Sequence, residues 1–588
     1  MSSRPARRAV PPHRLVMGAA VVLGLLVTAC VAAPDPEPTP VATTAPSPAV
    51  LAAVTAPAAE LALVGLEEPD ALALAASRAL YERGPVVVLA PAGEHVDQLV
   101  GASAAVALGV PLLLTGGPAD GEVAAELERL GAAAVLVVGS AATPAGLDAG
   151  LDVVTVAADG RPVDDLAEAT GLRLGGAQAV EEGQELVAVA ALGRPATTVL
   201  SSAAPVAAPE TPAPETPAPE TPATSAPATS APVARLPRVS PPEPAATTTV
   251  LTDGSRAHLA AVATARAAGM PVVVAPGGDP RASAATVDAL AGMGAVLALG
   301  PSFGSPEMLA ARLAAVSTGV QAPGGGQLVF PAAPGVPGKK YVALYGTPGT
   351  AALGLLGEQD VPATIARAQQ LAAEYQALTA DTVVPMLEVI ATIASAAPED
   401  GSYSRMRPID ELRPVVEAAG DAGIAVVLDL QPGRTDFVTQ AQQYAELLAL
   451  PHVSLALDPE WRLAPDQVHL RQIGSVGIDE VNAVVAWLAD FTRERALPQK
   501  MLVLHQFSLR MIGERERLDT SRDELALLIH VDGQGSQPAK AGTWAALQAG
   551  APAGVRWGWK NFIDEDVPML DPVQTYQVQP VPDLVTYQ

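Results

Sequence analysis

Short apolar runs alternate with amphipathic stretches along most of this chain. In its first half, continuous apolar runs at 85–90, 110–115 and 132–139 predict buried parallel strands, because strands covered on both faces are apolar throughout. The stretches at 95–109 and 121–131 have helical spacing. Strands that alternate with helices predict βαβ units and a parallel sheet.

The same order returns after an interruption rich in Pro, Glu and Thr. Residues 247–278 and 284–300 again pair a helical stretch with an apolar run. The interruption, which includes "PETPAPETPAPETP", has almost no apolar surface to bury, so residues 203–246 are interpreted as a disordered insert. The chain therefore predicts one α/β domain built from two related halves.

The repeated segments "GASAAVALGVPLLLTGG" and "ELERLGAAAVLVVG", with their counterparts after the insert, resemble the cell-wall-binding repeat type 2 family. The resemblance covers roughly residues 60–320 and implies a wall-binding domain, which we place at 58–322. An α/β domain that only spaces or packs against its neighbour is the alternative.

A Pro- and Gly-rich linker at 323–338 separates this domain from a second pattern in residues 339–588. Helical stretches at 361–378, 410–423 and 478–495 lie among the apolar runs. Eight strand–helix units in about 250 residues predict a C-terminal (β/α)₈ barrel, with a doubly wound sheet as the alternative. The eight strands are expected at 341–346, 383–391, 424–431, 453–458, 471–477, 501–507, 525–533 and 554–561.

Polar side chains end most of these apolar runs. In a (β/α)₈ barrel, the carboxyl ends of the strands carry the chemistry, so these side chains are expected to gather at one site. They are Glu388, Asp429, Asp458, Glu460, His505, Gln506, Asp532 and Lys560.

The motif "ALDPEW" places Asp458 and Glu460 two residues apart at the end of the fourth run. Pro459 cannot donate to a sheet, so both acids are expected at the rim, where their mutual repulsion raises the pKa of one. The motif resembles the D-x-E of (β/α)₈ glycoside hydrolases, and this resemblance implies that Glu460 is the acid and Asp458 its partner. Asp532, on the seventh expected strand, is the candidate second carboxylate.

The remaining candidates are expected to bind substrate. They are Glu388, Asp429, His505, Gln506 and Lys560, with Trp461, Trp557 and Trp559 as flat faces for sugar rings, although large aromatic residues also pack in cores. Four of the polar groups could converge on an ion, but the chain has no H-E-x-x-H spacing. No metal or other cofactor is predicted.

The N-terminus has the pattern of an export signal. Four arginines in the first fourteen residues precede an apolar run at 15–27, which is too short to span a bilayer comfortably. The following "LVTAC" resembles the bacterial lipobox, which implies cleavage before Cys30 and a lipid on its thiol. Cys30 is the single cysteine, so no disulfide is possible. We expect a signal peptide at 1–29 and a Pro/Thr/Ala-rich tether at 30–57.

The net charge of the chain argues against nucleic acid as a partner. The chain has 62 acidic and 35 basic residues, a formal net charge of −27, so it lacks the basic character of nucleic-acid-binding proteins. The sequence predicts a lipoprotein on the outer face of the cytoplasmic membrane whose barrel hydrolyses or binds a cell-wall glycan. A non-catalytic wall-binding or scaffold lipoprotein is the alternative.

Overall fold

The computed structural model describes residues 49–144, 150–203, 235–243 and 248–588. The expected signal peptide, Cys30 and most of the tether lie outside the described residues, as does most of the expected insert at 203–246. Part of that insert is described and forms strand β11 (Val239–Ser240), which pairs in parallel with β1 (Val50–Leu51). The expectation of disorder was therefore wrong for these residues.

The N-terminal region contains two parallel four-stranded sheets. The first has the order β6-β5-β7-β8, and the second has the order β13-β12-β14-β3, so the earliest strand of the second sheet precedes the whole first sheet in sequence. The apolar runs thus form strands as predicted. The strands are β5 (Val86–Pro91), β6 (Leu112–Thr115), β7 (Ala134–Val138), β8 (Asp152–Val156), β3 (Leu61–Val64), β12 (Thr248–Thr252), β13 (Val272–Val274) and β14 (Ala295–Leu299).

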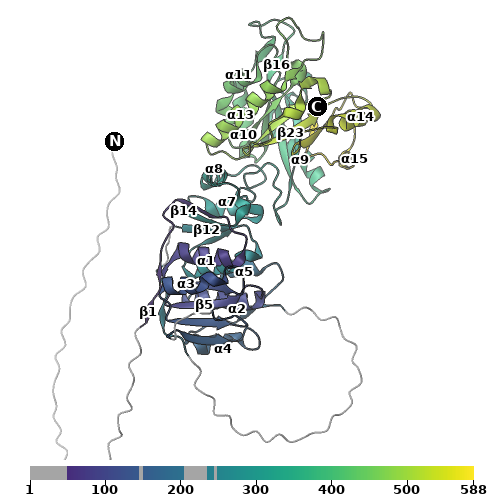
Figure 1. The fold of residues 1–588 in the computed structure, drawn as a ribbon. Helices are drawn as coiled ribbons and strands as arrows, with labels where there is room; N and C mark the ends of the chain where they lie inside the picture. Colours follow the sequence, from purple (N-terminus) through teal and green to yellow (C-terminus); the bar gives the residue numbers. More distant parts are fainter. Residues whose placement is uncertain (1–48, 145–149, 204–234, 244–247) are drawn as a thin grey trace, which may run out of the picture. The chain divides into compact units, whose positions relative to one another are not determined.

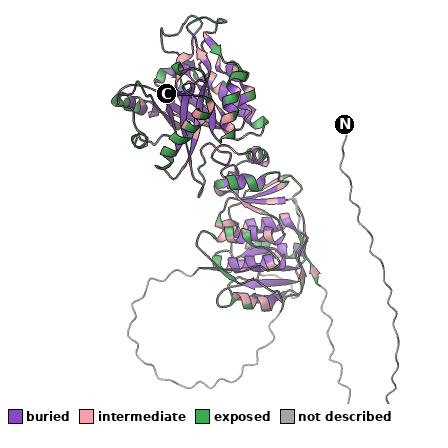
Figure 2. Cartoon of the chain, turned by 180° about the vertical axis from the view of Figure 1, so that it is seen from behind, coloured by how far each residue is buried: buried purple, intermediate pink, exposed green. Residues whose placement is uncertain are grey.

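Ala-rich helices join the two halves into one hydrophobic core. Helix α6 (Leu259–Ala267) contacts both α1 (Pro69–Leu80) and α2 (His95–Leu108). Thr264 on α6 accepts a hydrogen bond of 3.0 Å from the backbone N–H of Leu112 in the first sheet. Small side chains let these helices approach closely, and the buried strands and helix faces of this region are visible in Figure 2.

Residues 339–588 form a closed barrel of eight parallel strands, as predicted, with helices around it (Figure 1). Closure is shown by β15, which pairs with β16 on one side and with β25 on the other. The barrel strands are β15 (Lys339–Gly346), β16 (Thr382–Ala394), β18 (Ala425–Leu430), β19 (Val453–Leu457), β21 (Lys500–His505), β23 (Leu525–Val531), β24 (Arg556–Asn561) and β25 (Leu584–Tyr587).

One expected strand was wrong. The run at 471–477 contributes only β20 (Val476–Gly477), which pairs with β22 (Ile512–Gly513) outside the barrel. The eighth barrel strand is β25, a run of four residues at the end of the chain. Asp532 consequently follows the sixth barrel strand and not the seventh.

The helices around the barrel have one apolar face each. In α13 (Ile478–Glu494), Ile478, Val481, Val485 and Leu488 recur at helical spacing and are buried. Helix α9 (Val361–Gln376) begins after Asp360, whose side chain accepts a hydrogen bond from the N–H of Ala363. The other helices of this region are α10 (Ile409–Asp421), α11 (Phe437–Gln443), α12 (Ala445–Leu448), α14 (Gln537–Gln548) and α15 (Pro572–Thr575).

The inward-facing side chains of the strands form two layers inside the barrel, an apolar one and a polar one. Side chains two residues apart face the same side of a strand, so Val384, Met386 and Glu388 of β16 all face inward. The lower positions are apolar and pack with Val427, Val503 and other residues of the inner core. Toward the carboxyl ends the inward positions of most strands are polar, as at Asp429 of β18, His505 of β21 and His530 of β23, so polar groups gather at this end.

Gly558 leaves room for one of these polar groups. A Cβ atom at this position would lie 2.4 Å from Cδ2 of His530 on the neighbouring strand. Replacing Gly558 by Ala therefore forces the buried His530 ring to move, and we expect the free energy of unfolding to fall by about 1–3 kcal/mol. Chemical denaturation of Gly558→Ala measures this loss.

Gly542 in α14 provides the matched control, since a Cβ there meets no atom within 4 Å. Ala at this helical position is expected to stabilise the protein by about 0.5–1 kcal/mol. Equal stability of the Gly558→Ala variant and the parent would contradict the tight packing of His530.

Within the residues that the structure describes, none of the helices combines the length and apolar character needed to cross a bilayer.

Candidate active site

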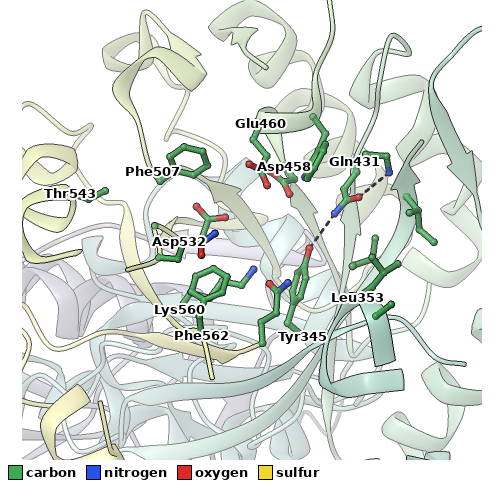
Figure 3. A pocket seen from close by; sticks show the side chains of 18 residues that line it. Tyr345, Leu353, Gln431, Asp458, Glu460, Phe507, Asp532, Thr543, Lys560 and Phe562 are labelled. Carbon is green, nitrogen blue, oxygen red and sulfur yellow. Dashed lines mark hydrogen bonds between the residues drawn. The ribbon is translucent and has the colours of Figure 1, made fainter. Parts of the chain in front are cut away.

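A cavity of about 600 Å³ opens at the carboxyl ends of the barrel strands. Figure 3 shows the carboxyl groups of Asp458 and Glu460 next to each other, with that of Asp532 turned toward the same space. Three aromatic rings that could lie along a sugar ring, those of Trp461, Phe507 and Phe562, also line the cavity. The cavity thus combines carboxyl groups with apolar faces.

Asp458 and Glu460 lie at the rim, as the sequence predicted, but a turn and not the end of a strand places Glu460 there. Strand β19 ends at Leu457, and Pro459–Trp461 form a single 3₁₀ turn. The N–H of Asp458 still donates to the carbonyl of Leu430 at 3.1 Å, while the carbonyl of Glu460 accepts from Gly474 at 2.7 Å. Both acids therefore sit on fixed backbone, although Glu460 is no longer part of the strand.

Burial and neighbouring charge favour the protonated forms of both acids. Burial raises the pKa of Glu460 to about 7, and the charge of Asp532 acts in the same direction. Burial also raises the pKa of Asp458 well above its usual range, with the nearby Glu460 adding to the effect. Glu460 can consequently hold a proton near neutral pH.

The pKa of Asp532 is shifted in the opposite direction, because of the neighbouring His505. The fully buried His505 ring lies 3.0 Å from Asp532 through Nδ1 and 2.7 Å from Glu388 through Nε2. Burial alone would lower the pKa of His505, but these two carboxylates raise it well above its usual value, so both ring nitrogens donate. Burial alone would raise the pKa of Asp532, yet the hydrogen bond and charge of His505 outweigh it and lower that pKa.

Tyr345 and Asp429 form a second pair at the base of the cavity. The Tyr345 hydroxyl donates to Asp429 at 2.8 Å, and the Lys560 ammonium group lies 3.6 Å from the centre of the Tyr345 ring. Burial raises the pKa of Asp429 to about 6, although the charge of His505 opposes this shift. The side-chain amide of Gln431, which directly follows the strand that carries Asp429, donates to the same hydroxyl at 3.4 Å.

Several buried acceptor atoms of the site have no protein partner. They include one oxygen each of Glu388, Asp429, Asp458 and Asp532. Buried polar atoms are normally hydrogen-bonded, so these oxygens are placed to accept bonds from a bound molecule or from water. Hydroxyl groups of a sugar are suitable donors.

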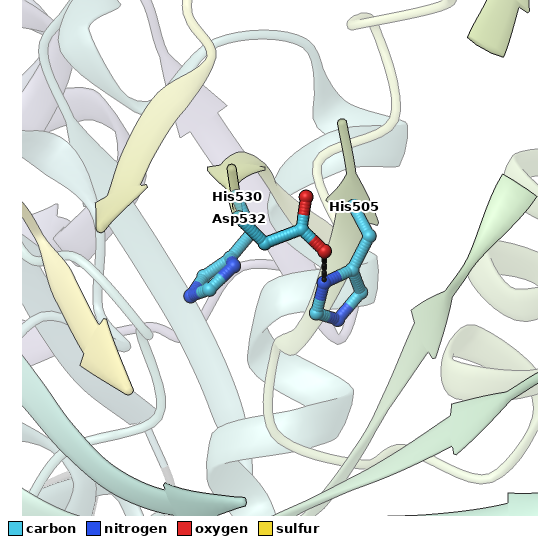
Figure 4. A group of neighbouring side chains, drawn as sticks. All are labelled: His505, His530 and Asp532. Carbon is cyan, nitrogen blue, oxygen red and sulfur yellow. Dashed lines mark hydrogen bonds and ion pairs between the residues drawn. The ribbon is translucent and has the colours of Figure 1, made fainter. Parts of the chain in front are cut away.

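Three of the site's side chains are close enough to share a metal ion. Ligand atoms of His505, His530 and Asp532 lie within 4.8 Å of one another (Figure 4). However, both nitrogens of His505 already bond to carboxylates, and the Nε2 atom of His530 lies 3.0 Å from the Thr586 hydroxyl oxygen. A metal would have to displace a bond of His505, so the arrangement fits a hydrogen-bonded network better than a metal centre.

Not every residue expected from sequence lies at the site. Gln506 bonds to Ser508 and to Arg515, outside the cavity lining. Trp557 and Trp559 pack around Trp544 in a separate cluster, with ring centroids 5.9 and 5.4 Å from it. Gln506, Trp557 and Trp559 therefore do not line the cavity. The cavity is instead reached by Trp461, Lys560 and the three acids Asp458, Glu460 and Asp532, while Glu388, Asp429 and His505 lie directly beneath it.

Sequence reasoning missed several residues of the site. They are Tyr345, Gln431, Phe507, His530 and Phe562. The alternation along each strand contained the signal for two of them, since Tyr345 occupies the last inward position of β15 and His530 lies two residues before Asp532.

Comparison with known proteins gives only distant likeness. No protein-family model and no curated protein sequence matches the chain. Among solved structures, Cwp6 from Clostridium difficile is 12% identical with a TM-score of 0.30, covering 64% of this chain and 63% of Cwp6. A sugar phosphate isomerase/epimerase from Parabacteroides distasonis is also 12% identical, with a TM-score of 0.21, covering 44% of this chain and 89% of the other. The chain thus spans less than two thirds of Cwp6, and function has to be argued from the site.

Proposed function

We propose that the barrel hydrolyses a cell-wall glycan, with Glu460 as general acid and Asp532 as base or nucleophile. The observation that carries this proposal is that one cavity brings together two carboxyl groups in different environments: Glu460 is buried near other acids, whereas Asp532 is bonded to the His505 ring. Burial raises the pKa of Glu460 to about 7, while the hydrogen bond and charge of His505 lower the pKa of Asp532 despite its burial. Two carboxyl groups whose pKa values differ in this way supply an acid and a base at the same pH.

In this mechanism Glu460 gives its proton to the glycosidic oxygen as the bond to the anomeric carbon breaks. The ionised Asp532 either removes a proton from the attacking water or bonds to the anomeric carbon itself. In the second case, water later releases the sugar and Glu460 takes that water's proton. Both routes consume one water molecule and yield a new reducing end.

The residues around the pair have supporting roles in the proposal. His505 holds Asp532 in its ionised form and in one orientation through the 3.0 Å bond. Trp461 and Phe507 offer apolar faces to the sugar ring, and the free oxygen of Asp458 can accept from its hydroxyl groups.

The proposed location rests on the sequence. The lipobox-like segment would anchor Cys30 in the outer face of the membrane, and the tether would hold the folded regions within reach of the wall. Residues 58–322 would bind the wall, leaving residues 339–588 to act on it. A lipid-anchored enzyme and its insoluble substrate would then occupy the same compartment.

The proposal is tested by incubating purified full-length protein with peptidoglycan and with other wall polysaccharides. We expect new reducing ends, and mass spectrometry should show products that carry one added water. Products without added water would indicate elimination or isomerisation and contradict hydrolysis, as would a complete lack of products from every glycan.

The pH dependence of the rate follows from the two pKa shifts. The protonated fraction of Glu460 falls as the pH rises through about 7, so kcat/KM should decline on the alkaline side with an apparent pKa near 7. Asp532 loses its charge only below the usual pKa of an Asp side chain, so the acidic limb should lie below about pH 4. A rate that rises steadily from pH 6 to 9 would contradict these assignments.

A further inference from the structure

Two further cavities lie next to the active-site cavity, and Glu460 belongs to the lining of the nearer one. A second cavity of about 330 Å³ shares Glu460 and Trp461 with the first. A third of about 380 Å³ shares Gln472 and Ile473 with the second. We define this groove by the second and third cavities; its walls are the segments 469–475 and 508–511.

The groove is held open by a fixed loop. His469 bonds through Nε2 to the carbonyl of Tyr403 at 2.8 Å, and its ring packs 5.4 Å from Trp461. Next to it, Leu470 adopts the left-handed conformation with φ 63° and is 84% exposed. A bulky apolar residue rarely takes this conformation, and here it holds an apolar side chain at the groove where a ligand can cover it.

The charge of the groove differs from that of the catalytic cavity. Arg471 and Arg510 line it, and neither forms an ion pair within the part of the chain that the structure describes. Apart from Glu460, no carboxylate lines the groove in that part. Two arginines without an ion pair in the described residues are available to pair with an anionic ligand in the groove.

We propose that this groove binds the departing portion of an anionic glycan, so that the barrel cleaves within a chain and not only at its end. This inference rests on the proposed function, in which Glu460 protonates the leaving oxygen. Because Glu460 lines both spaces, the sugar under attack lies between Glu460 and Asp532, and the leaving portion lies in the groove. The anion is a carboxylate or a phosphate carried by the glycan.

The test compares full-length parent protein with an Arg471→Gln, Arg510→Gln double variant. Substrates are oligomers of increasing length from peptidoglycan, which carries carboxylates, and from a phosphate-bearing wall polysaccharide, beside an aryl glycoside that has no sugar on the leaving side. Arg556→Gln is the control, since Arg556 starts β24 at the opposite end of the barrel.

The parent's kcat/KM should rise with the number of leaving-side sugars. Each exposed arginine–anion pair contributes about 1.4- to fivefold, so the double variant should lose about two- to 25-fold on the anionic oligomers and nothing on the aryl glycoside. Which of the two oligomer series shows the loss identifies the anion. Cleavage that is independent of length, or an unchanged kcat/KM in the double variant, would overturn the assignment of the groove.

A binding measurement separates this inference from the proposed function. Binding of both oligomer series to parent and double variant is measured by calorimetry. If the parent releases no product but binds either series more tightly than the double variant does, the hydrolase proposal is wrong and the groove remains a binding site for an anionic glycan. Equal binding by parent and double variant would remove the groove assignment, whether or not hydrolysis is found.

Discussion

Glu460→Gln is expected to lower kcat on wall glycan by about 10²–10⁴-fold, the range of a general acid. Gln has nearly the same shape as Glu but no carboxylic proton, so the glycosidic oxygen must leave unprotonated. An aryl glycoside with an acidic phenol needs little protonation and should lose far less. Steady-state kinetics on both substrates measure the difference.

The variant should also lose the alkaline limb of the pH profile, because the group with the pKa near 7 is gone. Glu494→Gln is the matched control: Glu494 ends α13 and its side chain is 70% exposed. If the phenol substrate and the glycan lose equal activity, Glu460 is not the acid.

Asp532→Asn is expected to remove activity on every substrate, by about 10⁴-fold, the upper end of the range for a general base. The ionised carboxylate is needed whatever the leaving group, so an acidic phenol should give no rescue. This uniform loss distinguishes Asp532 from Glu460. The kinetic comparison uses the same glycan and aryl glycoside.

The amide side chain of the Asp532→Asn variant retains an oxygen that accepts from His505 but loses the charge of the buried pair. We expect the free energy of unfolding to fall by about 1–3 kcal/mol, which denaturation measures separately from activity. Asp479→Asn, at a side chain that is 81% exposed, is the control. A folded Asp532→Asn protein with near-parent rates would contradict the role of Asp532.

The barrel and much of its site could be predicted from one rule, namely that successive side chains of a strand point to opposite faces of the sheet. Asp429 and His505 lie at or next to the ends of apolar strands, Glu388 lies within one, and the parity of each run already directs all three into the barrel. The same parity explains two errors. Gln506 follows the inward His505 and must face away from it, while Trp557 and Trp559 have the opposite parity to Lys560.

Other features depend on contacts that no local pattern contains. Strand β25 has four residues and is fixed by its pairing with β15, which is distant in sequence, and with β24, which is close. The turn at Pro459–Trp461 is stabilised by a hydrogen bond from Gly474, so the position of Glu460 depends on the conformation of the loop that follows. Asp532 stays ionised because His505 and Glu388 come together from two other strands.

Cleavage of a glycosidic bond by the barrel, with Glu460 as its acid, can be measured directly. New reducing ends are counted as they are released from purified wall glycan at pH 6 by full-length parent and by Glu460→Gln in parallel. We expect steady release by the parent and release by the variant reduced at least about 100-fold, with both proteins equally folded. Equal release by the two proteins would contradict it, and so would no release by the parent while glycan binding is intact.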